Sequence, residues 1–345
     1  MRKVNFIWAI PLFLILTGCG EKRRPISESD DFITVDVTKK YPEKELILQN
    51  FFDVEYTALE TNDDFLCQGV VLAVGHNVIL VKNQLNDGEL FIFDRKGKGL
   101  RKINRKGQGS EEYISIPEIT LDEDNNEIFI NNFNRILIYD LFGNFKRKIL
   151  HAEGYSYRSI DNFNTEFLIC NNSSFDNEEE TEKTPFVLIS KQDGSVIRDV
   201  QIFSQQKIPT TKKINHNGFT IVGYGTNFPS TSVVWCHDSW ILTVYSSDTV
   251  FRFFPDQSMA PFMVRTPSIE SNNPESFLSP TVLTERCFFL QTIKMEPEVQ
   301  GSTPADAILI YPQTHLMFDK QEKTIYEYTA YNDDYSNKVT VDILK

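Results

Sequence analysis

The chain has 345 residues, of which 41% are hydrophobic and 24% are charged, and its formal net charge is −13. This composition is that of a globular protein with a sizeable core, and it excludes a disordered or fibrous chain. The acidic balance excludes a general nucleic-acid-binding protein, because such a protein needs a basic surface to neutralise phosphates.

The first 18 residues have the features of a bacterial lipoprotein signal peptide. Arg2 and Lys3 precede an apolar run over residues 6–16, which is too short to span a bilayer and has the length of a signal-peptide core. Residues 16–19 (Leu-Thr-Gly-Cys) follow directly and resemble the lipobox of bacterial lipoproteins. The resemblance implies cleavage before Cys19, a diacylglycerol on its sulfur and an acylated new N-terminus, so that several acyl chains anchor the protein to a membrane.

Residues 19–31 are polar and show no periodicity. We predict that they form a flexible tether between the lipid and a folded domain that spans residues 32–345. Within that domain, residues 43–52 are the stretch that is compatible with a short helix.

An internal repeat dominates the rest of the chain. Residues 90–103 contain an apolar strand, an Asp, a Gly-containing turn and a basic second strand, and the same pattern returns 46 residues later in residues 136–149. The Asp-x-x-Gly turn suits a tight hairpin, because Asp caps the turn and Gly adopts a positive φ. Further copies begin at Phe186, Thr249 and Leu316.

Each hairpin follows another short apolar run, which gives three to four strands in roughly 45–50 residues, the rhythm of a β-propeller blade. Five repeats are visible, and the remaining apolar stretches lie towards the two ends of the chain, in residues 32–37, 54–59 and 339–344. A ring has no open sheet edge when strands from both termini share one blade. The sequence therefore predicts an all-β, six-bladed β-propeller, with three to four antiparallel strands per blade and a ring closed by the terminal strands.

Three motifs carry a resemblance to a known family: residues 54–61, residues 107–113 (Gly-Gln-Gly-Ser-Glu-Glu-Tyr) and residues 247–252. They are similar to motifs of the six-bladed β-propeller lipoproteins of Bacteroides-type bacteria, which are related to NHL-repeat propellers. That family usually has Pro at the position of Ser110. The resemblance covers essentially all of residues 32–330 and implies the same fold and a place in the cell envelope. It implies no activity, because the family is mostly of unknown function.

The residues after the lipidated cysteine suggest a side of the membrane. Many surface-exported lipoproteins of this group carry an acidic run at that point, whereas here Cys19 is followed by Gly-Glu-Lys-Arg-Arg. We therefore predict a lipid anchor in the outer membrane and favour its periplasmic side over the cell surface.

The motif at residues 107–113 links the outer strand of one predicted blade to the inner strand of the next. In propellers such links lie on the face where the central channel opens, and we take Gln108, Glu111, Glu112 and Tyr113 as candidate ligand-binding residues. The alternative is a structural clip between blades, in which Tyr113 is packed and the glutamates are solvated. Both interpretations are open from the sequence.

The sequence shows few signs of metal or catalytic chemistry. Its five histidines have no His-x-His or His-x₃-His spacing, so we do not expect a zinc site built from neighbouring ligands. Residues 122–127 resemble the start of a calcium loop but lack the Gly that an EF-hand needs at its sixth position, which favours a polar turn. We predict no cofactor. A divalent metal in the central channel is an alternative, because its ligands would come from separate blades.

Four cysteines fall in the predicted domain, namely Cys67, Cys170, Cys236 and Cys287, and each lies in a strand-like apolar run. Disulfides are stable outside the cytoplasm, but the spacing suggests no pair and a chain of this length needs no covalent staples. We therefore expect unpaired thiols that behave as small buried hydrophobic side chains.

Taken together, these features favour a lipid-anchored binding or interaction module of the cell envelope. Its ligand would be a glycan, a peptide or a partner protein, and not a nucleic acid. One alternative is a glycan- or peptide-directed hydrolase or lyase with a site in the central channel, whose residues would lie about 50 positions apart in the sequence. A second alternative is a structural subunit of an envelope complex.

Overall fold

A computed structural model of the protein describes residues 32–84, 86–172, 184–203, 212–216, 218–223, 232–303, 306–335 and 339–343. In this part of the chain the regular structure is almost entirely β-strand, and the helical elements are two short 3₁₀ turns, η1 (Leu48–Asn50) and η3 (Ile269–Ser271). None of the helices described there is long and apolar enough to cross a membrane. The predicted signal peptide, Cys19 and the tether up to residue 31 lie outside the described residues.

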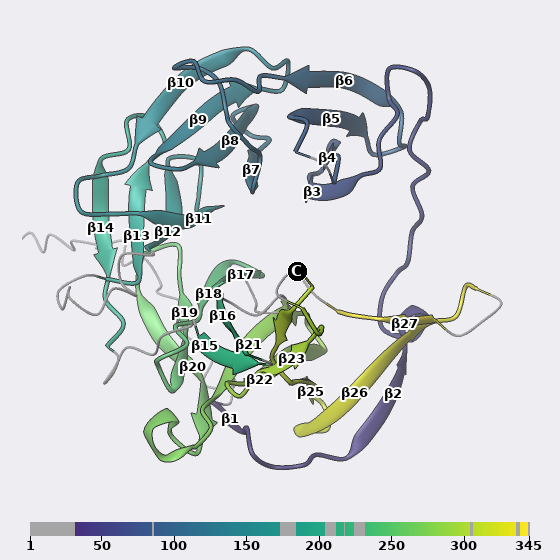
Figure 1. Ribbon diagram of the computed structural model, residues 1–345, viewed down its shortest axis with the longest axis vertical. Coiled ribbons are helices and arrows are strands. Elements are labelled where there is room, and N and C mark those ends of the chain that lie inside the picture. The colour runs from purple at the N-terminus through teal and green to yellow at the C-terminus, as the bar shows by residue number, and fades with distance from the viewer. Residues whose placement is uncertain are drawn as a thin grey trace, which may run out of the picture. The chain divides into compact units, whose positions relative to one another are not determined.

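The first three sheets are four-stranded, and each is built from strands that are consecutive in the chain (Figure 1). The first sheet contains β3 (Val70–Val74), β4 (Val78–Lys82), β5 (Glu89–Asp94) and β6 (Gly99–Asn104). The second contains β7 (Ile119–Asp122), β8 (Glu127–Asn132), β9 (Arg135–Asp140) and β10 (Phe145–Leu150). The third contains β11 (Tyr157–Asn162), β12 (Phe167–Asn172), β13 (Phe186–Ser190) and β14 (Val196–Val200).

The fourth and fifth sheets also recruit strands from the ends of the described chain. The fourth sheet contains β17 (Val233–Cys236), β18 (Ser239–Leu242), β19 (Thr249–Phe253) and β20 (Met259–Thr266), and β1 (Ile33–Asp36) pairs in parallel with β20. The fifth contains β21 (Ser276–Leu283), β22 (Cys287–Lys294), β25 (Gln313–Asp319) and β26 (Thr324–Asn332). To β26 are added β2 (Glu43–Ile47), which is parallel, and β27 (Val339–Val341), which is antiparallel. Two separate hairpins are β15 (Lys212–His216) with β16 (Phe219–Gly223), and β23 (Glu298–Gln300) with β24 (Ile308–Ile310).

The repeated hairpin turns form as the sequence predicts. In the first sheet, the Asp94 carboxylate accepts hydrogen bonds of 2.9 Å from the backbone N–H groups of Lys96 and Lys98. Gly97 adopts a φ of 82°, a conformation that is strained for residues with a Cβ atom. The second sheet repeats this arrangement, since Gly143 has a φ of 83° in the turn that follows β9.

Both faces of each sheet carry apolar side chains, because inner strands such as β5 contain consecutive apolar residues and successive side chains point to opposite faces. In β5, Leu90 and Ile92 pack against the second sheet, whereas Phe91 and Phe93 pack on the other face. Similar buried clusters join the second sheet to the third, the third to the fourth and the fourth to the fifth. A sheet of this kind needs apolar cover on both sides.

Residues 48–67 and the C-terminal segment cover the two sheet faces at the ends of this series. Leu59, Phe65 and Cys67 pack on the Phe91 and Phe93 face of the first sheet. The fifth sheet is covered by a larger group, namely Leu48, Phe51, Phe52, Val341 and Ile343. Figure 1 shows the chain running from β2, at the fifth sheet, to the first sheet through this segment.

Hydrogen bonds tie the same segment to both sheets. The Tyr56 hydroxyl donates to the Asp334 carboxylate (2.9 Å) and accepts from the Asn332 amide (2.8 Å) at the end of β26. Glu60 donates its backbone N–H to the Gly97 carbonyl (2.7 Å) in the first sheet. The segment therefore bridges the last sheet and the first.

The predicted all-β propeller is confirmed, but the terminal strands are distributed differently from the prediction. Strands from both ends of the chain do share the fifth sheet, as β2 and β27. Residues 32–37, however, supply β1 to the fourth sheet, and residues 54–59 form no strand. The helix expected near residues 43–52 is instead β2 followed by η1. The physical reason is burial and pairing: β1 places Ile33 and Val35 in the core between the fourth and fifth sheets, and it satisfies the free edge of β20.

His151 gives the folded protein a defined response to acid. Its Nε2 donates to the Asn131 side-chain oxygen (3.0 Å), and its Nδ1 accepts the backbone N–H of Tyr157 (3.3 Å). The second bond requires the neutral ring, because a protonated Nδ1 cannot accept a hydrogen bond, and burial lowers the pKa of His151 to about 4. Unfolding restores a pKa near 6.5, so the unfolded chain binds an extra proton between these values. Stability from this group is complete above pH 6.5 and is lost as the pH falls towards 4.

We predict that the His151→Gln variant loses this part of the pH dependence. The wild type should lose about 2 kcal/mol more stability than the variant between pH 6.5 and 4, measured by urea unfolding at each pH. His76→Gln is the control, because His76 is exposed, and it should behave like the wild type. Identical pH profiles for wild type and His151→Gln would contradict the assignment.

Candidate functional site

A cavity of about 760 Å³ is the candidate functional site. The first strands of four successive sheets, namely β3, β7, β11 and β17, line most of it together with adjacent residues, and Trp240 of β18 completes the lining. Strand β7 contacts β3 on one side and β11 on the other, and Figure 1 shows these strands on the inner side of their sheets. The lining residues are residues 72–76, 118–124, 160–163, Val233, Trp235 and Trp240. The cavity therefore lies along the inner strands of four sheets, where the propeller prediction places the central channel, and it is called the channel cavity below.

One wall of this cavity is aromatic. Trp235 and Trp240 face each other across the β17–β18 hairpin, and their rings meet edge to face with centroids 4.7 Å apart. Behind them, Trp240 packs on Phe163 at 4.2 Å and donates its indole N–H to the Asn162 carbonyl (3.1 Å). Trp240 is buried, whereas Trp235 is 53% exposed. The fold thus fixes one tryptophan and presents the other to the channel.

The lining is also acidic. Five carboxylates line the cavity, and the described residues that line it include no lysine or arginine. Asp122 is buried and forms an ion pair with the buried Lys191. Glu123 accepts the backbone N–H groups of His76, Asn77 (2.9 Å) and Val78 (3.1 Å), so it clips the second sheet to the first. The other three are Glu118, Asp124 and Asp161.

This arrangement suits binding through an aromatic face and hydrogen-bond acceptors. A large flat ring that is half exposed in a concave site is a common anchor for ligands. Within the described residues, no group of three or more His, Cys, Asp or Glu side chains is placed to hold a metal ion. The channel metal and the hydrolase or lyase alternative therefore stay predictions without a supporting observation from these residues.

The structure places the sequence-predicted site residues away from this cavity. Tyr113 is fully buried; its hydroxyl donates to the Gly88 carbonyl (2.7 Å) and accepts the backbone N–H of Arg105 (2.9 Å). Its ring also meets Tyr139 edge to face at 6.0 Å. These contacts are those expected for a structural clip, one of the two interpretations that the sequence left open.

The other three predicted residues surround this clip. Glu112 is half-buried and accepts the backbone N–H of Gly109 (2.8 Å), while Gln108 and Glu111 are exposed. None of the four lines the channel cavity or the smaller pocket of about 220 Å³. A ligand contact by Gln108 or Glu111 stays a prediction.

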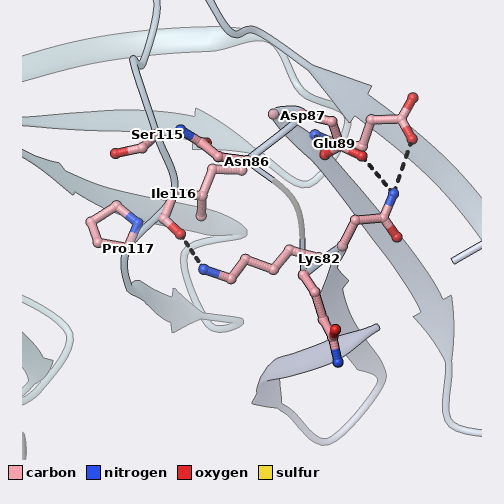
Figure 2. Close-up of a pocket in the computed structure, with 10 residues that line it drawn as sticks. Lys82, Asn86, Asp87, Glu89, Ser115, Ile116 and Pro117 are labelled. Carbon is pink, nitrogen blue, oxygen red and sulfur yellow. Dashed lines mark hydrogen bonds between the residues drawn. The ribbon is translucent and has the colours of Figure 1, made fainter. Parts of the chain in front are cut away.

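A second, smaller pocket of about 220 Å³ lies next to the clip, between residues 82–84 and 86–89 on one side and residues 115–117 on the other (Figure 2). The Lys82 ammonium donates to the Ile116 carbonyl (2.6 Å), and the Asn83 amide donates to the Asp87 carboxylate (2.7 Å). These polar groups already form hydrogen bonds with one another. The contacts around the pocket therefore serve to join the first two sheets. The larger channel cavity remains the stronger candidate.

Two other sequence predictions are confirmed in the described residues. The four cysteines are unpaired, three of them fully buried and Cys67 half-buried. Burial raises the pKa of the Cys170 thiol, and the nearby carboxylates add to this effect, so this thiol is unreactive at neutral pH. Residues 122–127 form the turn between β7 and β8, in which the Asn125 amide donates to the Asp122 carboxylate (2.8 Å).

Sequence reasoning missed the tryptophans. Trp235 and Trp240 lie in apolar runs that predict strands, and their facing positions depend on the register of the β17–β18 hairpin. One signal was available: two of the three tryptophans of the chain flank the short polar stretch at residues 237–239. Aromatic residues on both arms of a hairpin become neighbours on one face.

Comparison with known proteins supports the fold. A family model described as a 6-bladed beta-propeller matches residues 25–343. No curated protein matches the sequence. The described residues contain five sheets of four or more strands, and residues 48–67 with the C-terminal segment cover the faces that a sixth would cover.

Of the solved structures compared, the first supports the fold alone. A candidate exported protein of Bacteroides fragilis NCTC 9343 superposes with a TM-score of 0.57 at 16% identity, over 86% of this chain and 80% of the other. The WD40 domain of Neurospora crassa Pan2 gives 0.40 at 9% identity, over 81% and 75%. A Bacteroides thetaiotaomicron VPI-5482 protein of unknown function gives 0.35 at 12% identity, over 74% and 67%.

We predict that Tyr113→Phe destabilises the protein. The variant leaves the Gly88 carbonyl and the Arg105 N–H without the hydroxyl that joins them, which should cost about 1–3 kcal/mol in the free energy of unfolding. Urea unfolding measures this loss, and Gln108→Ala is the control, since Gln108 is exposed. If Tyr113→Phe is as stable as the wild type, the clip interpretation is wrong.

Proposed function

This chain belongs to the 6-bladed beta-propeller family, and we propose that it is a binding module of the cell envelope whose glycan or peptide ligand enters the channel cavity. The observation that carries this proposal is the half-exposed Trp235 in a cavity of about 760 Å³. Pockets of roughly 300–1,000 Å³ enclose most of a small ligand's surface. An exposed tryptophan leaves its apolar area in contact with water, and a ligand that covers it recovers that free energy.

The supporting contacts make the site rigid. Trp240 is held by Phe163 and by the Asn162 carbonyl, and Trp235 rests against Trp240. Glu123 and the Asp122–Lys191 pair fix the acidic part of the lining to the neighbouring sheets. A preformed wall loses little conformational entropy when a ligand binds, so more of the contact free energy appears as affinity.

The N-terminal sequence supports a location for this module. We propose that Cys19 carries the lipid, that residues 20–31 hold the propeller on the outer membrane, and that it faces the periplasm. The support is the lipobox-like sequence that ends at Cys19 and the missing acidic run after it. An anchored propeller would meet its ligand at the membrane surface.

We predict that Trp235→Ala abolishes ligand binding without unfolding the protein. At a ligand concentration of 100 times Kd, binding adds about 2.7 kcal/mol of stability. The thermal midpoint of the full-length protein should therefore rise with a ligand from a panel of glycans and peptides, and the rise should disappear in the variant. An equal rise in wild type and Trp235→Ala would place the binding site elsewhere. Phe142→Ala is the matched control, because Phe142 is 62% exposed and outside the cavity.

We also predict that Cys19→Ser releases the protein from membranes. The substitution removes the thiol that would carry the diacylglycerol, and with it the buried acyl chains. The measurement is the share of protein that partitions into the detergent phase of a Triton X-114 extract. The wild type should enter the detergent phase and the variant should stay in the aqueous phase or keep its signal peptide. Equal partition of a processed variant would contradict lipidation at Cys19.

A further inference from the structure

We infer that the ligand of the channel cavity is a neutral glycan, with a sugar ring stacked on Trp235. This inference rests on the proposed function and adds the class of ligand to it. Three properties of the cavity carry it: an open indole face, polar groups in the same lining, and the absence of lysine and arginine from the described residues of that lining.

The indole face is the first property. An edge-to-face pair leaves at least one face of each partner free of the other, and Trp235 is 53% exposed within the cavity lining. The C–H groups on one side of a pyranose ring are slightly positive, and the aromatic face is negative, so the two attract when they stack. The same contact removes apolar area from water on both partners.

The polar groups in the same lining are the second property. Asn162 and Asp124 are exposed and line the cavity, as does Asp161 on the same strand as Asn162. An amide can both donate and accept hydrogen bonds, and a carboxylate has about four acceptor sites. Sugar hydroxyl groups need such partners, because each is a donor and an acceptor at once.

The charge of the lining is the third property. Among its described residues, the lining has five carboxylates and no lysine or arginine, and the nearby Lys191 is already paired with Asp122. Arg95 reaches the edge of the site, where its guanidinium donates to the Gly75 carbonyl (3.3 Å). A site lined by one sign of charge repels ligands of that sign. Uronic-acid, sulfated and phosphorylated glycans are therefore disfavoured, and neutral ones are accepted.

Intrinsic fluorescence offers a direct test on the full-length protein. The chain has three tryptophans, and two of them, Trp235 and Trp240, line the cavity. The probes are neutral tetrasaccharides (maltotetraose, cellotetraose and mannotetraose), the acidic tetragalacturonate and the basic peptide pentalysine. We expect at least one neutral tetrasaccharide to change the emission in a saturable way, and tetragalacturonate to bind at least tenfold more weakly.

Variants separate stacking from general effects. Trp235→Ala should weaken binding of the neutral sugar at least tenfold, Trp235→Phe should retain part of it because the ring remains, and Phe142→Ala should change nothing. Asp124→Asn keeps a side chain that can form hydrogen bonds but removes a negative charge. It should therefore reduce the difference in affinity between the neutral tetrasaccharides and tetragalacturonate. Because emission of Trp240 reports in the Trp235 variants, each titration keeps a signal.

The outcomes distinguish this inference from the proposed function. Binding of pentalysine or tetragalacturonate that depends on Trp235, with no binding of any neutral tetrasaccharide, overturns the neutral-glycan inference and leaves the binding site standing. Neutral-sugar binding that Trp235→Ala does not weaken overturns stacking on this residue. The absence of any binding by the five probes counts against both proposals.

Discussion

The two-sided apolar character of the sheets is the constraint on which the rest of this structure depends. In the first sheet, Leu90 and Ile92 pack against the second sheet, whereas Phe91 and Phe93 lie on the other face and need a different packing partner. A sheet with two apolar faces is stable only when both are covered. Each blade therefore needs its neighbours to cover its two faces. At the ends of the series, the uncovered faces must be covered by another segment of the chain, or the series must close into a ring.

Residues 48–67 meet this requirement at the point where the fifth sheet ends and the first begins. They cover one face of the fifth sheet and one face of the first with apolar side chains. They are also hydrogen-bonded to β26 through Tyr56 and to the first sheet through Glu60. The same packing aligns the first strands of four sheets along one cavity. The candidate ligand site is thus a consequence of how the sheets cover one another, and its wall is as rigid as the core behind it.

The sequence predicted those features that depend on local chemistry. Asp94 and Gly97 specify their turn within four residues, and the spacing of such turns specifies the blades. It did not predict which partner each terminal strand chooses, because β1 and β2 pair with strands more than 200 residues away. Nor could it place Trp235 beside Trp240 and Phe163, since that contact depends on hairpin register and on the packing of the third sheet against the fourth. The link motif at residues 107–113 shows the converse: a distinctive local sequence, centred on Tyr113, proved to be a packed clip.

Amide hydrogen exchange of the Phe65→Ala variant tests most directly whether residues 48–67 stabilise the first sheet by covering the face that a sixth blade would cover. Phe65 lies 5.5 Å from Phe93 and 6.4 Å from Phe91, measured between ring centroids. If the segment is needed to cover the first sheet, the variant should lower the free energy of opening of β4 and β5 by about 1–2 kcal/mol, while the third sheet keeps its protection. Unchanged protection in β4 and β5 would show that the first sheet needs no such cover, and would contradict the account.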